Sequence, residues 1–289
     1  MNLLLYFLAL FCLSQASILI KLAAAPPDVI GFWRLLTASL LFLPWALWKG
    51  SLLKTLKNPP REIGYIFLTA LFFFGHLWTY FFAAQNTKIA NCMIIFATNP
   101  LFTAAGSTFF FGEKFSWRLG LAYILALAGI LLLVQHSMIW NPKSLHGELA
   151  SLVSALLFAG YLLSGKKSRM SFSNSTYSGI LYFLTAILFG LSGAIKSINF
   201  VDYPSVTWWS IAGTVFLPTL LGHALISYLM NQMNLNLMTC GKLIEPVLSA
   251  LTAFFIFTER PPPGAYLAFG LTACAILVLF WPRRIGRQG

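Results

Sequence analysis

One pair of ionisable residues lies deep inside an apolar segment of this sequence. Glu245 stands nine residues into the apolar run 236–257, and Lys242 precedes it by three residues, which places both on one face of a helix. At about 1.5 Å per residue, Glu245 is roughly 13 Å from the start of the run. A charge at that depth in a membrane costs at least about 2.5–3.5 kcal/mol, so Glu245 should face a cavity or a partner.

Lys242 can neutralise Glu245, and Pro246 loosens the helix beside it by removing a backbone hydrogen bond. Two interpretations remain open. Glu245 binds substrate or a proton, or the two residues form a structural ion pair that holds the segment together. Asn99 takes the corresponding place in the run 89–111 but is uncharged, which confines any charge-based role to the second half of the chain.

Histidines and aromatic residues provide further candidates for a binding site. A histidine can relay protons near neutral pH, although a buried one more often hydrogen-bonds a neighbouring helix. Aromatic side chains suit a planar or cationic substrate, although lipid-facing packing accounts for most of them in a chain that is 16% aromatic. The candidates are His76, Tyr80, His223, Tyr228, Trp78, Phe96, Tyr161 and, in the first apolar run, the polar Gln15.

Charges around the sequence "APPD" (25–28) are candidates for a gate. Lys21 and Arg34 lie near the outer ends of the first two apolar runs, and Asp28 is near enough to pair with one of them. Snorkelling of the two cations to the membrane interface is the alternative to a gating salt bridge. Glu113 and Glu259, each followed by a cation, are expected to fix loops.

The composition sets the class of protein that must position these residues. The chain has 289 residues, of which 58% are hydrophobic and 9% charged, whereas soluble domains carry about 25% charged residues. The sequence therefore predicts an all-α polytopic membrane protein. The four cysteines stand singly within apolar runs, so neither a metal site, a cofactor nor a disulfide is expected.

Ten membrane-spanning helices can be placed along the chain, separated by short turns rich in proline. The apolar start of the chain continues to residue 25 without a basic leader, so it is expected to be the first span and not a signal peptide. The expected spans are 2–24, 29–48, 62–84, 89–111, 118–136, 146–165, 176–195, 206–229, 236–257 and 264–281.

The distribution of positive charge predicts the orientation. Twelve of the nineteen Lys and Arg residues fall on the side that holds both termini, which the positive-inside rule places in the cytoplasm. The net charge of +12 is then a feature of topology and not of nucleic-acid binding. The expected location is the cell (inner) membrane.

The sequence contains an internal repeat. "TNPLFTAAGSTFFFGEKF" (98–115) aligns with "IEPVLSALTAFFIFTERP" (244–261), and "GHLWTYFFAAQ" (75–85) aligns with "GHALISYLMNQ" (222–232). The predicted organisation is a first five-helix repeat at 1–137, a second at 146–282 and a basic tail at 283–289. Because five is odd, the second repeat enters the membrane from the opposite face, an arrangement typical of secondary transporters.

These segments, together with "ILIKLA" and "FWRLLTASLLFLP", closely resemble the ten-span EamA-type branch of the drug/metabolite transporter superfamily. The resemblance implies two five-helix halves around a central cavity and export of small metabolites such as amino acids. The chain has "SQAS" (14–17) where these proteins often have Trp-Gly, so the identity of the substrate does not transfer.

The function expected is a secondary transporter that moves a small metabolite by alternating access, with export favoured. A flippase for lipids or lipid precursors is the alternative. An intramembrane enzyme is not expected, because HExxH and GxSxG motifs are absent, and the absence of a Walker loop argues against direct ATP use. The expected partners are a small-molecule substrate, the lipid bilayer and, as a candidate coupling ion, protons. The chain is expected to act as a monomer or homodimer.

Overall fold

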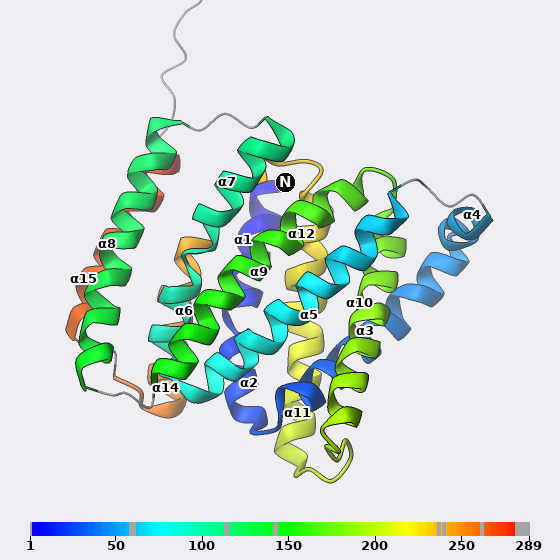
Figure 1. Ribbon diagram of the computed structural model, residues 1–289, viewed down its shortest axis with the longest axis horizontal. Helices are drawn as coiled ribbons and strands as arrows, with labels where there is room; N and C mark the ends of the chain where they lie inside the picture. Colours follow the sequence, from blue (N-terminus) through cyan, green and yellow to red (C-terminus); the bar gives the residue numbers. More distant parts are fainter. Residues whose placement is uncertain are drawn as a thin grey trace, which may run out of the picture.

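The computed structural model describes residues 2–57, 62–112, 116–140, 144–235, 238, 241–260 and 263–280. Every regular element within these ranges is a helix, and the helices pack side by side in one bundle (Figure 1). In chain order they are α1 (Asn2–Ser14), α2 (Ala16–Ala23), α3 (Pro27–Trp48), α4 (Ser51–Lys57), α5 (Ile63–Asn86), α6 (Ile89–Phe96), α7 (Asn99–Phe111), α8 (Trp117–Trp140), α9 (Leu145–Arg169), α10 (Asn174–Ile195), α11 (Ser205–Thr214), the π-helix η2 (Val215–His223), α12 (Ala224–Leu229), the 3-10 helix η3 (Lys242–Ile244), α14 (Glu245–Phe257) and α15 (Pro263–Phe280).

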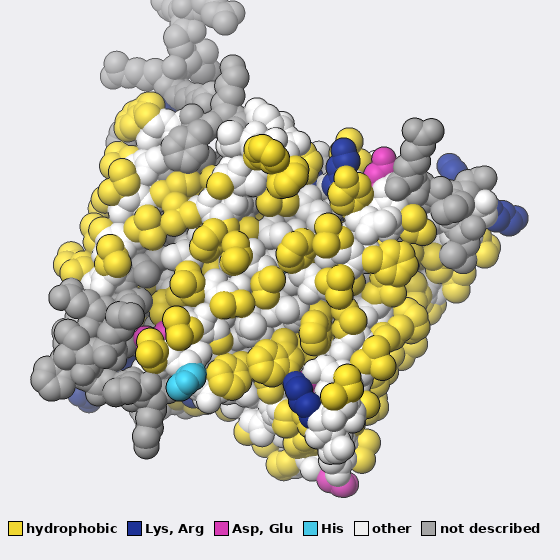
Figure 2. Space-filling model, in the orientation of Figure 1, with side chains coloured by type: hydrophobic (Ala, Val, Ile, Leu, Met, Phe, Trp, Pro, Cys, Tyr) yellow, Lys and Arg dark blue, Asp and Glu magenta, His cyan; other side chains and the backbone are white. Residues whose placement is uncertain are grey.

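Among the described residues, seven helical segments are long and apolar enough to cross a membrane. They correspond to the first four and the sixth to eighth expected spans, and α8, α14 and α15 occupy the places of the other three. Figure 2 shows apolar side chains spread over the face formed by α5, α7 and α9, as expected of helices that contact lipid. The all-α polytopic fold is therefore confirmed, while the count of ten spans remains a prediction.

The internal repeat is visible as two matching helices. α7 and α14 each have 13 residues, and each begins one residue before a proline, Pro100 or Pro246. Each also ends at a residue in the left-handed conformation, Gly112 with φ 63° and Thr258 with φ 54°. The two halves thus build the same broken helix at equivalent places.

The packing of the helices is symmetric between the halves. Equivalent helices meet each other, α3 against α10 and α8 against α15. The third span of one half packs against the first span of the other, as α5 does on α9 and as α11 and η2 do on α2 and α1. This exchange pattern supports the two-repeat architecture. The repeat boundaries stay predictions, and Glu113 and the tail 283–289 lie outside the described residues.

Proline explains the breaks that divide the fourth and ninth spans. Pro100 has no N–H for the carbonyl of Phe96, four residues earlier, and α6 ends at Phe96. The side-chain amide of Asn99 donates to that carbonyl instead, at 2.9 Å. In the second half, Pro246 similarly frees the carbonyl of Lys242, which accepts from the backbone N–H of Glu245 in a 3-10 turn.

Candidate functional site

A small cavity lies where the broken helices of the two halves meet. The space in it that water could occupy is about 20 Å³, room for about one molecule. Both halves contribute to its wall, which combines charged, histidine and aromatic side chains. The lining residues are Leu13, Ala16, Arg34, His76, Leu77, Tyr80, Phe96, Phe158, His223, Lys242 and Glu245. This cavity is the candidate site.

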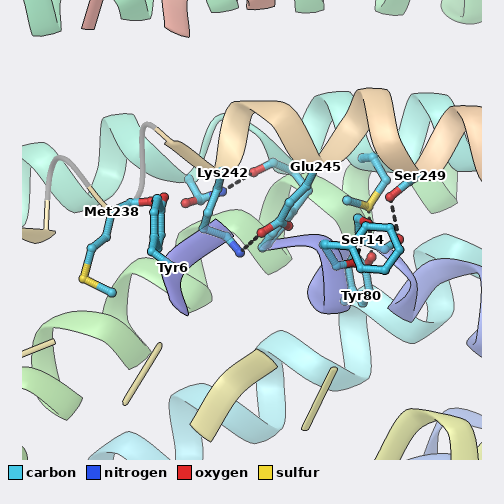
Figure 3. Close-up of polar contacts among 11 residues, drawn as sticks. Tyr6, Ser14, Tyr80, Met238, Lys242, Glu245 and Ser249 are labelled. Carbon is cyan, nitrogen blue, oxygen red and sulfur yellow. Dashed lines mark hydrogen bonds and ion pairs between the residues drawn. The ribbon is translucent and has the colours of Figure 1, made fainter. Parts of the chain in front are cut away.

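Lys242 and Glu245 form an ion pair at the wall of this cavity, from η3 and the first residue of α14 (Figure 3). Their side chains are 5% and 4% exposed, so the pair is shielded from solvent. The ammonium also lies 5.0 Å from the ring centroid of Phe158, within cation–π range. The hydroxyl of Ser249 donates to the carbonyl of Ser14 at 2.6 Å and ties α14 to α1.

Arg34 is the second buried cation of the cavity. It is 1% exposed, and its Nε donates to the hydroxyl of Thr219 at 2.6 Å. Its Nη1 and Nη2 atoms have no hydrogen-bond partner among the described residues. The Phe81 ring lies 5.6 Å from the guanidinium carbon. The expectation that Arg34 snorkels to the membrane interface is therefore wrong, because its side chain turns into the bundle.

The position of Thr219 depends on the π-helix η2. Pro218 lies inside η2, where backbone hydrogen bonds join residues five apart, and the Thr219 hydroxyl donates to the carbonyl of Thr214 at 2.7 Å. Because this bond uses its hydrogen, the Thr219 oxygen is left as an acceptor for Arg34. Sequence reasoning did not single out Thr219. The one feature of the sequence that could have pointed to Thr219 is Pro218, a proline inside an apolar span.

The two histidines that the repeat relates meet across the interface between the halves. His76 and His223 lie with ring centroids 6.4 Å apart, and both line the cavity. His76 Nδ1 is 2.8 Å from the hydroxyl of Ser154 on α9, whereas His223 Nδ1 has no partner within the described part of the chain. Both rings are therefore placed to contact a ligand.

Four of the five aromatic candidates fall into three groups. Tyr80 and Phe96 line the cavity, and the Phe96 ring stacks on His76 at 5.4 Å. Tyr161 is buried behind that lining, with its ring 6.0 Å from His223. Tyr228 is 38% exposed and is not part of the cavity wall, so it does not fit the expected aromatic lining.

Three further candidates lie outside the cavity. Asn99 is buried but caps the end of α6, as described above. Gln15 is partly exposed and donates to the Ser14 hydroxyl at 2.8 Å. The indole N–H of Trp78 donates to the carboxylate of Asp28 at 3.3 Å.

Two ion pairs link the halves near the end of α2, which is the second half of the first span. Asp28 pairs with Lys196 at 3.0 Å, and Lys21 pairs with Glu259. The expected pairing of Asp28 with Lys21 or Arg34 is therefore wrong. Glu259 also accepts from the backbone N–H of Ile89 at 3.3 Å, which joins three segments at this end. Because the orientation expected from the sequence would place this end outside the cell, we call these two ion pairs the outer bridges.

Within the described residues no group of three His, Cys, Asp or Glu side chains could hold a metal ion. A charged cavity between two repeats, at the place where one helix of each repeat is broken, is the arrangement of secondary transporters. The fold and the site therefore define a polytopic membrane protein of the transporter class. The chain belongs to the EamA-like transporter family, whose model matches residues 1–135 and 145–281.

Several curated proteins are similar to this chain along most of its length. An uncharacterized transporter of Archaeoglobus fulgidus is 24% identical over 84% of this chain and 83% of its own. An S-adenosylmethionine uptake transporter of Rickettsia bellii is 25% identical over 80% and 76%, and the protein RarD of Escherichia coli is 25% identical over 79% and 76%. A solved crystal structure has a TM-score of 0.76 with 20% identity over 96% of both chains, which supports the fold.

Proposed function

We propose that this protein is a secondary transporter that moves an amino acid or a related small metabolite across the inner (plasma) membrane by alternating access. The observation that carries the proposal is the cavity itself. Arg34, Lys242 and Glu245 are all buried there, between the two repeats. Charges within a membrane are costly and mark substrate or ion pathways.

Contacts that close the cavity on both sides support alternating access. The outer bridges each join the first half of the chain to the second. At the other end of the first span, the Tyr6 hydroxyl donates to the carbonyl of Met238, which also joins the halves (Figure 3). Because the cavity has room for about one water, this conformation corresponds to an occluded state. Breaking the contacts of one side at a time would expose the cavity to each face in turn.

The chemistry of the wall and the names of the relatives support the substrate class. The Rickettsia relatives are named S-adenosylmethionine uptake transporters, and that compound combines an amino-acid group with a cationic sulfonium. The cavity offers an anion-binding Arg34, the carboxylate of Glu245, and the aromatic faces of Phe96 and Phe158 for a cation. An amino acid with a cationic or planar side group fits these features.

Counterflow into proteoliposomes tests the function. The purified protein is placed in vesicles that are loaded with one unlabelled compound. The vesicles should then accumulate the same compound in labelled form from outside. Neither a channel nor a protein that only binds the compound would produce this accumulation. The panel should contain amino acids, S-adenosylmethionine, nucleosides and sugars. Accumulation of an amino-acid compound supports the proposal, and transport of labelled phospholipid between leaflets without any counterflow would contradict it.

The same vesicles test direction and coupling. We propose cytoplasmic termini and net export, although the Rickettsia relatives are named for uptake. Protons are the proposed coupling ion, because His76 and His223 face the cavity together. An imposed pH gradient should then drive accumulation of the labelled compound above equilibrium. Equal rates with and without the gradient would remove protons from the mechanism.

A further inference from the structure

The charges around the cavity do not balance. Glu245 is engaged by Lys242, so these two side chains neutralise one another. Arg34 has no carboxylate in salt-bridge contact among the described residues, and only its Nε has a hydrogen-bond partner. With the histidines neutral, the cavity carries one uncompensated positive charge. A buried guanidinium in this situation favours the binding of an anion.

We propose that Arg34 binds the carboxylate of the transported molecule, so that the substrate class is carboxylate-bearing; this inference rests on the function proposed above. The Nη1 and Nη2 atoms are both buried and without partner in the described chain, and Arg34 lines the cavity. A guanidinium edge with two free donors matches the two oxygens of a carboxylate in a bidentate pair.

The orientation of Arg34 is fixed before any ligand arrives. The Thr219 hydroxyl accepts from its Nε, and the same hydroxyl donates to the carbonyl of Thr214 at the start of η2. The Phe81 ring supports the guanidinium from one side. A donor pair that is already oriented loses little conformational freedom when the anion binds, which favours affinity.

The chain contains a useful contrast in Arg169, which is also buried. The Nε of Arg169 donates to the carbonyl of Ser227 at 3.0 Å, and its Nη1 donates to the carbonyl of Phe172. It also lies 5.8 Å from the ring of Tyr177 and is not part of the cavity wall. Arg169 therefore has the contacts of a structural arginine, whereas Arg34 keeps its two terminal donors free. This makes Arg169→Met a matched control.

Because the cavity is small, an anion smaller than a carboxylate is an alternative ligand for Arg34. A chloride ion is close in size to the single water that the closed cavity accommodates, whereas an amino acid requires it to widen. The shared chemistry is an anion on the terminal nitrogens of Arg34. Carboxylates and chloride must therefore be compared directly.

Thermal unfolding of the purified protein, at constant ionic strength, provides the test. The ligands are an amino acid from the counterflow panel, its amide, its decarboxylated amine, and chloride. The variants are Arg34→Met, Arg34→Lys and Arg169→Met. We expect the amino acid to stabilise the wild type, and its amide and amine to bind at least about tenfold more weakly. We expect Arg34→Met to abolish this preference, Arg34→Lys to keep part of it, and Arg169→Met to keep all of it.

The ligand-free proteins give a second readout that a structural role would not produce. Because Arg34 leaves two buried donors unpaired, Arg34→Met should unfold at the same or a higher temperature than the wild type. Arg169→Met should unfold at a lower temperature, because it leaves two carbonyls without their donor. If Arg34→Met fails to fold, Arg34 is structural and the inference is overturned. The inference is also overturned if chloride stabilises the wild type as strongly as the amino acid does.

Flux separates this inference from the proposed function. If carboxylates stabilise the protein in a way that depends on Arg34 but no compound gives counterflow, the binding site is supported and the transport proposal is contradicted. Counterflow of the amide or the amine at the same rate as the amino acid would retain transport and overturn the role of Arg34.

Discussion

The ion pair between Lys242 and Glu245 permits a quantitative test that separates structural and functional roles. Replacing only one partner, as in Glu245→Leu, leaves the Lys242 ammonium without its carboxylate. Because both side chains are at most 5% exposed, bulk water does not replace the lost partner. Removing one member of a buried pair costs about 3–5 kcal/mol. The Phe158 ring, 5.0 Å from the ammonium, offsets part of this loss, so we expect the lower end, about 3 kcal/mol.

Replacing both partners with apolar residues of similar size should behave differently. The variant Lys242→Met with Glu245→Leu removes both charges and both desolvation penalties. Such replacements range from neutral to about 1–4 kcal/mol more stable. The double variant should therefore be more stable than Glu245→Leu by at least about 3 kcal/mol. The free energies of unfolding are measured by denaturant titration of the purified proteins in one detergent.

Counterflow of the same double variant then addresses function. We expect it to fold and insert normally but to lose transport, because Glu245 faces the cavity that the substrate must occupy. If Glu245→Leu is as stable as the double variant, the pair is not buried in the way described and the energetic reasoning is refuted. If the stable double variant still transports, Glu245 has no part in the mechanism.

Three further predictions follow from individual contacts. Asn99→Leu should lower the free energy of unfolding by about 1–3 kcal/mol, because it leaves a buried carbonyl at the end of α6 without a donor, and an unchanged value would contradict this account. Pro218→Ala should weaken carboxylate binding, because without the proline η2 can relax to an α-helical turn in which the restored N–H takes the carbonyl of Thr214 and Thr219 shifts away from Arg34; equal affinity would exclude that coupling. Asp28→Asn removes an outer bridge, so a cysteine placed at Leu13 in a cysteine-free background should react faster with an impermeant thiol reagent added outside, and an unchanged rate would argue against gating.

Much of the fold could be predicted because a membrane restricts the choice of structure. Apolar runs of sufficient length must be helices there, and Pro246 was expected to loosen its span at the place where α14 begins. The equivalent break before α7, at Pro100, was not predicted. The π-helix η2 could not be predicted, because an apolar run with one proline is compatible with a kinked α-helix as well. Its wider turn changes which side chains face inward, and this is what brings Thr219 to Arg34.

Contacts of the candidate site could be predicted where they depend on local spacing, and they were missed where they depend on contact between the halves. Lys242 and Glu245 are three residues apart, so their pairing follows from helical geometry. The pairing of Asp28 with Lys196 joins residues 168 positions apart, which a single sequence does not reveal. Arg34 did carry a signal, since it stands seven residues into α3, about 10 Å from the end of the helix.

Tyr228 shows how an approximate repeat misleads. Tyr80 follows His76 by four residues, but Tyr228 follows its histidine by five. One additional residue rotates a helical side chain by about 100°. Tyr80 therefore shares the cavity with His76, whereas Tyr228 turns away, and the residue equivalent to Tyr80 by the repeat spacing is the buried Ser227.

The central claim is that the substrate passes through the cavity between the two repeats, and blocking that cavity tests it most directly. Ala16→Leu adds bulk at a buried position of the wall, and Leu41→Phe adds similar bulk at an exposed position on α3 as the matched control. Counterflow of the transported compound is measured for both variants, with insertion and folding verified. The account predicts that Ala16→Leu folds but loses counterflow while Leu41→Phe keeps it. Counterflow through Ala16→Leu at the wild-type rate would contradict the claim.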